Sequence, residues 1–267
     1  MTTIATVESD DTGLRLSRLS AWLVVCFLLL PITVIVPISL TDRPYLSLPA
    51  AGLSLQYFIN FFTSPDWLSS FGQSFFVAVC AMVIAALTGT LAAIGCWRLG
   101  GRVSDGMRAL MLLPMIIPQV VYALGIYRTY AEMHLLGTYT GVIIAHAVTG
   151  IPYVAILVSA ALADFDMRLD QAARSLGASI FQSITLVLLP IIRPAIASGA
   201  IFAFIHSWDE LLLVLFIGGR AIFTLPRRIW NGINDTLDPT MAAVATVLLF
   251  IACLLLVLDL VIRRRDL

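Results

Sequence analysis

Residues 170–190 read DQAARSLGASIFQSITLVLLP and lie between two long apolar runs. The start of this segment, together with residues 164–169 (DFDMRL), is far too polar to lie in lipid. The small side chains of Ala172 and Ala173 allow close backbone approach, and Gly177 permits a positive φ where the chain turns. We expect a helix–turn–helix with a nearly bare surface at its bend, which suits insertion into a groove of a partner protein. The alternative is an ordinary polar loop.

The apolar runs on either side of this segment are long enough to cross a membrane. The chain is 60% hydrophobic and 12% charged, whereas a soluble domain carries about a quarter charged residues. A helix needs about 20 predominantly apolar residues to cross the hydrocarbon core. We therefore expect an all-α integral membrane protein: an N-terminal segment, 1–21; one transmembrane domain, 22–262, with a polar loop at 164–190; and a tail, 263–267. The expected spans are 22–41, 71–97, 108–128, 138–163, 193–217 and 241–262.

One of these spans contains two prolines in its interior. Pro114 and Pro118 both lie within the run between Arg108 and Arg128, which is just long enough to cross the membrane. Proline removes a backbone hydrogen bond and clashes with the preceding turn, so we expect a kinked or locally unwound helix there.

The distribution of arginine indicates the orientation of the chain, because cytoplasmic segments carry an excess of basic residues. With a cytoplasmic N-terminus, eleven arginines lie inside and five outside, so we expect both termini on the cytoplasmic side. The inside set is Arg15, Arg18, Arg98, Arg102, Arg108, Arg168, Arg174, Arg193 and residues 263–265, and the outside set is Arg43, Arg128, Arg220, Arg227 and Arg228.

The composition also excludes several classes of function. The chain contains no lysine, so it has neither the lysine of a phosphate-binding P-loop nor the amine of a Schiff-base enzyme. Its formal net charge is zero, which gives no reason to expect nucleic acid as a partner. The four cysteines lack zinc-ligand spacing, and no catalytic cluster such as HExxH is present, so we expect no metal site and no enzyme.

The polar segment resembles the EAA loop of permeases of ATP-binding-cassette (ABC) importers. That pattern is Glu-Ala-Ala, three residues, Gly, nine residues, Ile, one residue and Leu-Pro. Here the same spacing holds Gln171 with its two alanines, Gly177, Val187 and then Leu189-Pro190. Glutamine replaces the glutamate and valine the isoleucine, and the first change turns a charged contact into a neutral hydrogen bond. Asp170, next to the glutamine, is a candidate to supply the charge.

The resemblance implies the six-helix fold of type I ABC-importer permeases in the bacterial inner membrane, with a short coupling helix between spans four and five. In such permeases this helix docks into a cleft of the ATP-hydrolysing subunit. It also implies a second homologous permease, two ATPase copies that bind ATP and magnesium, an extracytoplasmic substrate-binding protein and no cofactor on this chain itself. The implied contact residues are Asp170, Gln171, Ala172, Ala173, Arg174, Gly177 and Ala178.

The fifth run contains two neighbouring carboxylates, which are costly in lipid and usually face a cavity or a partner. Asp209 and Glu210 follow Trp208, and we interpret these three residues as candidates for a substrate pathway that attracts a cation. In the alternative interpretation the carboxylates anchor the helix by pairing with Arg220 or with the partner permease.

The C-terminal third is similar to spermidine/putrescine-type permeases in SWDELLLVLFIGG, TLPRRIWNGIND and LDPTMAAVATVLL. This resemblance implies import of polyamines, and the alternatives are an opine, an amino acid or a related solute in the same importer class. A stand-alone secondary transporter is a further alternative, although we find no internal repeat of the kind such transporters commonly show.

Residues 224–235 are expected to form a short amphipathic helix at the outer interface, because Pro226 fits its first turn and the apolar residues fall on one face. Arg227, Arg228 and Trp230 are candidates to contact the docked binding protein. Alternatively, the arginines extend to lipid phosphates.

Overall fold

The computed structural model describes residues 11–50, 52–235 and 237–265, and within these ranges it contains helices and no strand. Of the predicted N-terminal segment 1–21, residues 1–10 lie outside these ranges, and the side chains of residues 11–16 are outside the description. Residues 266 and 267 of the predicted tail also lie outside these ranges. The predicted all-α class is confirmed. The helices are α1 (Asp11–Ser39), α2 (Gln56–Thr63), α3 (Pro65–Leu99), α4 (Gly101–Ile116), α5 (Gln119–Glu132), α6 (Tyr139–Ala163), α7 (Met167–Ser175), α8 (Ile180–Ser183), the π-helix η1 (Ile184–Leu188), α9 (Leu189–Trp208), α10 (Leu212–Ile217), α11 (Leu225–Asp235) and α12 (Thr240–Arg265).

The chain forms two compact units. One unit consists of Met1–Ser64 with Asn231–Leu267, and the other is Pro65–Trp230. Within the first unit, α12 packs against α1 and α2, and Asn60 donates a hydrogen bond to the Thr240 hydroxyl at 2.9 Å. Asp238 begins α12 by accepting from the Thr240 backbone N–H at 2.9 Å.

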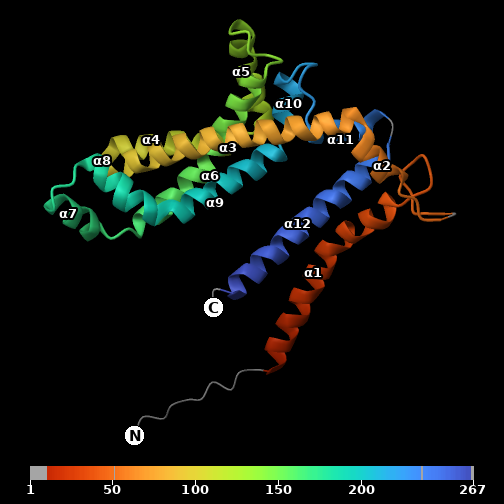
Figure 1. Cartoon of the computed structure of the whole chain (residues 1–267), viewed down its shortest axis with the longest axis horizontal. Coiled ribbons are helices and arrows are strands. Elements are labelled where there is room, and N and C mark those ends of the chain that lie inside the picture. Colours follow the sequence, from red (N-terminus) through yellow and green to blue (C-terminus); the bar gives the residue numbers. More distant parts are fainter. Residues whose placement is uncertain (1–10, 51, 236, 266–267) are drawn as a thin grey trace. The chain divides into compact units, whose positions relative to one another are not determined.

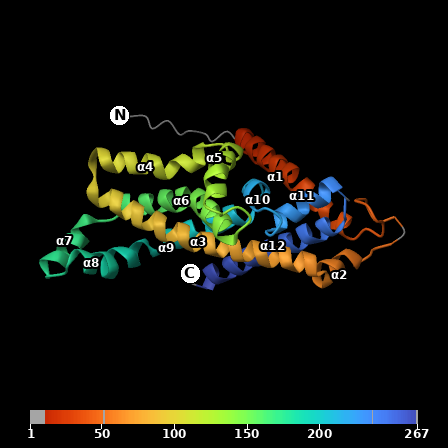
Figure 2. The same cartoon turned by 90° about the horizontal axis from the view of Figure 1, so that it is seen from above.

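The core of the second unit is a three-helix bundle of α3, α6 and α9, which lie side by side in Figures 1 and 2. Small residues let these helices approach closely. A Cβ added at Gly89 of α3 would lie 2.9 Å from the Val154 Cβ, and one at Gly199 of α9 would lie 2.8 Å from the Val154 Cα. Without a hydrophobic driving force between helices in lipid, such close backbone packing is the main source of association.

The predicted break in the third span is confirmed. α4 and α5 are bent by 105° at a break of at most four residues, and α5 turns away from the bundle in Figure 1. Pro118 precedes α5 with an extended ψ of 132°, whereas Pro114 is accommodated inside α4. The break therefore occurs at the second proline only.

The fifth span differs from its predicted bounds of 193–217. The helical stretch begins at Ile180 and ends at Trp208, so it runs through η1 and includes the end of the predicted polar loop. The chain then breaks at Asp209, and α10 follows as a separate short helix. The carboxylates thus lie at a helix break and not inside a continuous helix.

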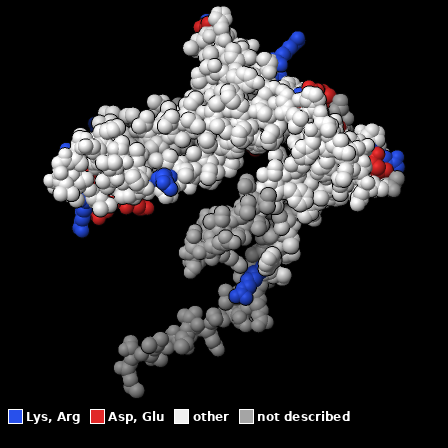
Figure 3. Space-filling view, in the orientation of Figure 1, with Lys and Arg blue, Asp and Glu red and all other residues white. Residues whose placement is uncertain are grey.

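Four helices are long and apolar enough to cross a membrane by length and composition: Ser17–Ser39, Pro65–Leu99, Tyr139–Ala163 and Ile180–Trp208. The bent pair α4–α5 makes a fifth if it counts as one span. In Figure 3 most of the visible surface carries no charged side chain, and acidic and basic groups lie together near the α7 end of the second unit. This distribution is typical of a protein whose helices face lipid.

Candidate functional site

The polar segment after α6 folds as a short helix, a tight turn and a second helix. Asp166 begins α7 by accepting a hydrogen bond from the Arg168 backbone N–H at 2.9 Å. Gly177 adopts a φ of +92°, which L side chains rarely adopt, so glycine allows the turn. Ser179 and Gln182 then form a reciprocal capping box that starts α8. The predicted helix–turn–helix is therefore present at one end of the bundle (Figures 1 and 2).

Asp170 has a different position from its neighbours on α7. It is buried, and its Oδ1 accepts hydrogen bonds from Arg98 Nη2 at 2.9 Å and from the Ser183 hydroxyl. These two donors hold the pKa of the Asp170 carboxyl below its ordinary value despite its burial, so the group is ionised at neutral pH. The hypothesis that Asp170 replaces the missing glutamate charge at the surface conflicts with this geometry, because its carboxylate faces the chain's own interior.

The remaining residues predicted at the partner contact lie at the surface or are partly buried. Gln171, Ala172, Arg174 and Gly177 are exposed, while Ala173 and Ala178 are half-buried. A large apolar residue that the sequence reasoning did not select, Leu176, is 90% exposed in the turn. No signal in the sequence singled it out, because other apolar residues of the same segment, such as Ile180 and Phe181, are also exposed.

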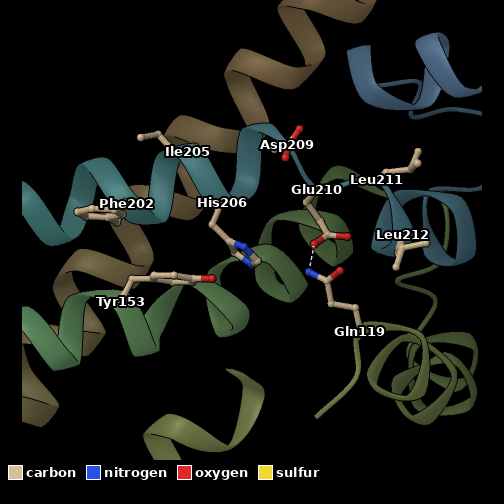
Figure 4. A pocket seen from close by; sticks show the side chains of 9 residues that line it. All are labelled: Gln119, Tyr153, Phe202, Ile205, His206, Asp209, Glu210, Leu211 and Leu212. Carbon is tan, nitrogen blue, oxygen red and sulfur yellow. Dashed lines mark hydrogen bonds between the residues drawn. The ribbon is translucent and has the colours of Figure 1, made fainter. Parts of the chain in front are cut away.

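A cavity of about 300 Å³ lies where α9 ends, between α6 and the start of α5. The aromatic ring of Tyr153 lies 5.0 Å from the His206 ring, and Gln119 and Glu210 form the opposite side in Figure 4. The cavity lining is Gln119, Tyr153, Phe202, Ile205, His206, Asp209, Glu210, Leu211 and Leu212. The sequence analysis did not select Gln119 and Tyr153. A polar group in an apolar run is costly in lipid, and this cost could have marked both residues as candidates for a cavity.

The two carboxylates at this cavity have different surroundings. Glu210 is buried, and it accepts hydrogen bonds from the Gln119 side-chain amide and, at 3.0 Å, from the Leu213 backbone N–H. It therefore joins the break after α9 to the break before α5. Asp209 is exposed, and its carboxylate points in another direction in Figure 4. Glu210 therefore fits the alternative interpretation, in which a carboxylate anchors the helix. Its partner is Gln119 and not the predicted Arg220.

Trp208 lies outside the lining of this cavity, so its place in the substrate pathway stays a prediction. Its ring contacts Phe71 of α3 edge-on, with centroids 5.5 Å apart, and stacks on Phe204 at 5.8 Å. Next to it, Ser207 bonds the buried His146 at 2.8 Å and so ties α9 to α6. These contacts fix the end of α9 on the bundle.

The predicted helix at 224–235 is confirmed as α11, but its arginines make contacts within their own unit. Arg228 donates to the Ser70 hydroxyl at 2.6 Å, and its guanidinium lies 3.7 Å from the Asp66 carboxylate. Arg227 donates to two backbone carbonyls of the preceding loop, those of Gly219 and Ile222. Both arginines thus hold α11 in place, and a contact of Arg227, Arg228 or Trp230 with a binding protein stays a prediction.

Comparison with known proteins places this architecture in a family. The family of binding-protein-dependent transport system inner membrane components matches residues 85–266, well over half of the chain. The chain belongs to this family. The resemblance inferred from the EAA-like segment is therefore confirmed.

Two relatives and one solved structure are similar to this chain over most of its length. The putrescine transport system permease protein PotI of Escherichia coli (strain K12) is 31% identical over 206 residues, 74% of this chain and 73% of PotI. The spermidine/putrescine transport system permease protein PotC of Haemophilus influenzae is 26% identical over 245 residues, 92% of this chain and 95% of PotC. A crystal structure of a bacterial ABC transporter involved in the import of the acidic polysaccharide alginate matches with a TM-score of 0.70 and 16% identity, over 98% of this chain and 99% of that one. At that identity the likeness shows the fold alone.

As a member of the binding-protein-dependent family, the chain is a permease subunit of an ABC importer and a non-catalytic, multi-pass membrane component. Such a permease works with an ATPase and a substrate-binding protein.

Proposed function

We propose that this permease moves polyamines of the spermidine and putrescine type into the cytoplasm by alternating access. The observation that carries the proposal is the cavity at the break after α9, whose lining combines two acidic residues, Asp209 and Glu210, with the rings of Tyr153 and His206. A carboxylate and an aromatic face both attract an organic ammonium group. The names of PotI and PotC, which transport putrescine or spermidine, support the same class of solute.

We further propose six spans with both termini in the cytoplasm. The four long helices, the α4–α5 pair and α12, which has 26 helical residues, supply the six. The arginine distribution supports the orientation, since it leaves eleven arginines on the cytoplasmic side and five outside. In this arrangement α7 lies in the cytoplasm and the cavity lies within the membrane.

In this proposal α7 is the coupling helix. The exposed residues of α7 from Gln171 onward and of the turn after it, including Leu176, dock into a cleft of the ATPase, which binds ATP and magnesium. The complete importer contains a second homologous permease, two ATPase copies and an extracytoplasmic binding protein. A large apolar side chain at 90% exposure in a polar turn supports the docking surface, because burial in a partner would remove it from water.

The test of the solute class is uptake by membrane vesicles that contain the permease with its partner subunits. We expect ATP-dependent uptake of labelled putrescine or spermidine, and a reduction of about tenfold or more in Asp209→Asn, because the mutation removes the exposed negative charge among the residues that line the cavity. Asp164→Asn, which neutralises a carboxylate at the far end of α6, is the matched control and should leave uptake unchanged. Uptake of an amino acid or an opine in place of polyamines would refute the polyamine assignment while leaving the importer class intact.

A further inference from the structure

On its inner side, α7 forms hydrogen bonds to two other helices through Asp170, a residue that the EAA-like pattern does not include. Of the nine residues of α7, Asp170 is the buried one, and its partners belong to other helices. Arg98 is in the last turn of α3, 72 positions earlier, and Ser183 ends α8, 13 positions later. A single carboxylate therefore links three helices at one end of the bundle.

The α3 side of this connection is itself held in place. The Arg98 guanidinium lies 5.5 Å from the centroid of the Trp97 ring, and its side chain is 22% exposed. The Trp97 ring in turn meets the buried Phe165 ring edge-on, with centroids 5.7 Å apart. Phe165 directly precedes the residue that caps α7, so an aromatic contact joins α3 to the connection before α7 and an ion pair joins α3 to α7 itself.

Asp170 is not needed to start α7 or to end it. Asp166 provides the N-terminal cap, and Gly177 provides the turn at the other end. The burial of a charged group within α7 therefore calls for an explanation other than helix formation. A buried ion pair is weak evidence for stability, because its desolvation cost offsets much of the attraction, whereas it does fix a specific geometry.

We propose that Asp170 is a positioning residue that ties the coupling helix to the end of α3, so that a displacement of α7 is passed directly to the three-helix bundle. Without this pair, α7 is joined to the bundle by its chain connections to α6 and α8, by its packing against α8 and η1 and by the Phe165–Trp97 contact. With it, movement of α7 also displaces α3, which packs along both α6 and α9. The inference rests on the proposed role of α7 and adds a second route for the force.

The experiment is a double-mutant cycle of Asp170→Asn and Arg98→Gln in the assembled importer. ATP hydrolysis, solute uptake and the amount of co-purified ATPase are measured for each variant. We expect each single variant to retain the ATPase and to transport about tenfold less solute per ATP hydrolysed. Because the two residues act as one unit, the double variant should be no worse than either single variant. Arg168→Gln, which removes an exposed arginine of the same helix, should leave the ratio unchanged.

The outcomes separate this inference from the proposed function. Multiplication of the two single defects to about a hundredfold, or normal coupling in both single variants, would overturn the positioning role. Gly177→Arg places a long side chain on the docking surface, and normal assembly and transport in that variant would overturn the proposed function itself. If the single variants fail to reach the membrane, Ser183→Ala removes one bond to Asp170 and leaves the charge pair. The tie to α3 is then intact, so an unchanged uptake per ATP in Ser183→Ala supports the inference, and a loss of about tenfold would assign the effect to the bond with α8 and overturn it.

Discussion

Asp209 and Glu210 are adjacent in the chain, yet the carboxylate of Asp209 is exposed, whereas that of Glu210 is buried and holds two broken helices together. The sequence identified the pair because carboxylates in apolar runs are costly. It could not assign the two roles, since the Gln119 partner of Glu210 lies 91 positions away. The same limit applies to Asp170, whose inward direction depends on an arginine 72 positions earlier.

Glu210→Ala should lower the free energy of unfolding by about 1–3 kcal/mol, because the mutation leaves the Leu213 N–H and the Gln119 amide without their acceptor. Thermal unfolding of the purified permease in detergent, followed by tryptophan fluorescence, measures the loss. Asp209→Ala is the matched control and should change stability by less than about 0.5 kcal/mol, since its side chain is exposed. Equal losses in the two variants would show that Glu210 is not the anchor.

At the scale of helices, the sequence predicted which segments are helical better than where they end. The break in the third span followed from its prolines, but the structure shows that Pro118 breaks the helix while Pro114 does not. The fifth span was displaced because an apolar run was extended across Asp209, where the helix in fact ends. Side-chain contacts with other helices decide such ends, and a single sequence contains no direct signal of them.

Close packing of α9 on α6 gives a prediction at this scale. Gly199→Ala should destabilise the permease by about 1–3 kcal/mol, because the new Cβ would lie 2.8 Å from the Val154 Cα, a backbone atom that cannot move aside easily. Gly95→Ala on α3 is the control, since a Cβ there meets nothing within 4 Å. Thermal unfolding in detergent compares the two variants. A loss in Gly95→Ala that matches the loss in Gly199→Ala would refute the close-packing argument.

The turn after α7 gives a second prediction for an element. Leu176→Ser should reduce the amount of ATPase that co-purifies with the permease by about tenfold, because the proposed interface would lose a buried apolar side chain at its centre. Leu99→Ser is the control, since this leucine is 67% exposed at the end of α3 and lies outside the proposed contact. If Leu176→Ser retained the ATPase and Leu99→Ser lost it, the ATPase would contact another part of the chain.

At the scale of the whole molecule, composition alone predicted a membrane protein, and the EAA-like spacing indicated the family that the match over residues 85–266 confirms. The six-span count, the orientation and the partners rest on physical argument and relatives, because a single chain without lipid or partners contains no direct record of them. The proposed orientation and the proposed coupling role depend on one statement, that α7 and its turn lie in the cytoplasm and contact the ATPase.

Site-specific cross-linking in intact membranes tests that statement directly. A single cysteine replaces Arg174 in a variant in which Cys26, Cys80, Cys96 and Cys253 are changed to serine, and a second variant carries its cysteine at Arg43. We predict an adduct between position 174 and the ATPase, with a yield that changes on adding ATP, and no adduct from position 43. Labelling of position 174 by a membrane-impermeant reagent added outside the cell, or the absence of its adduct in the assembled importer, would contradict the account.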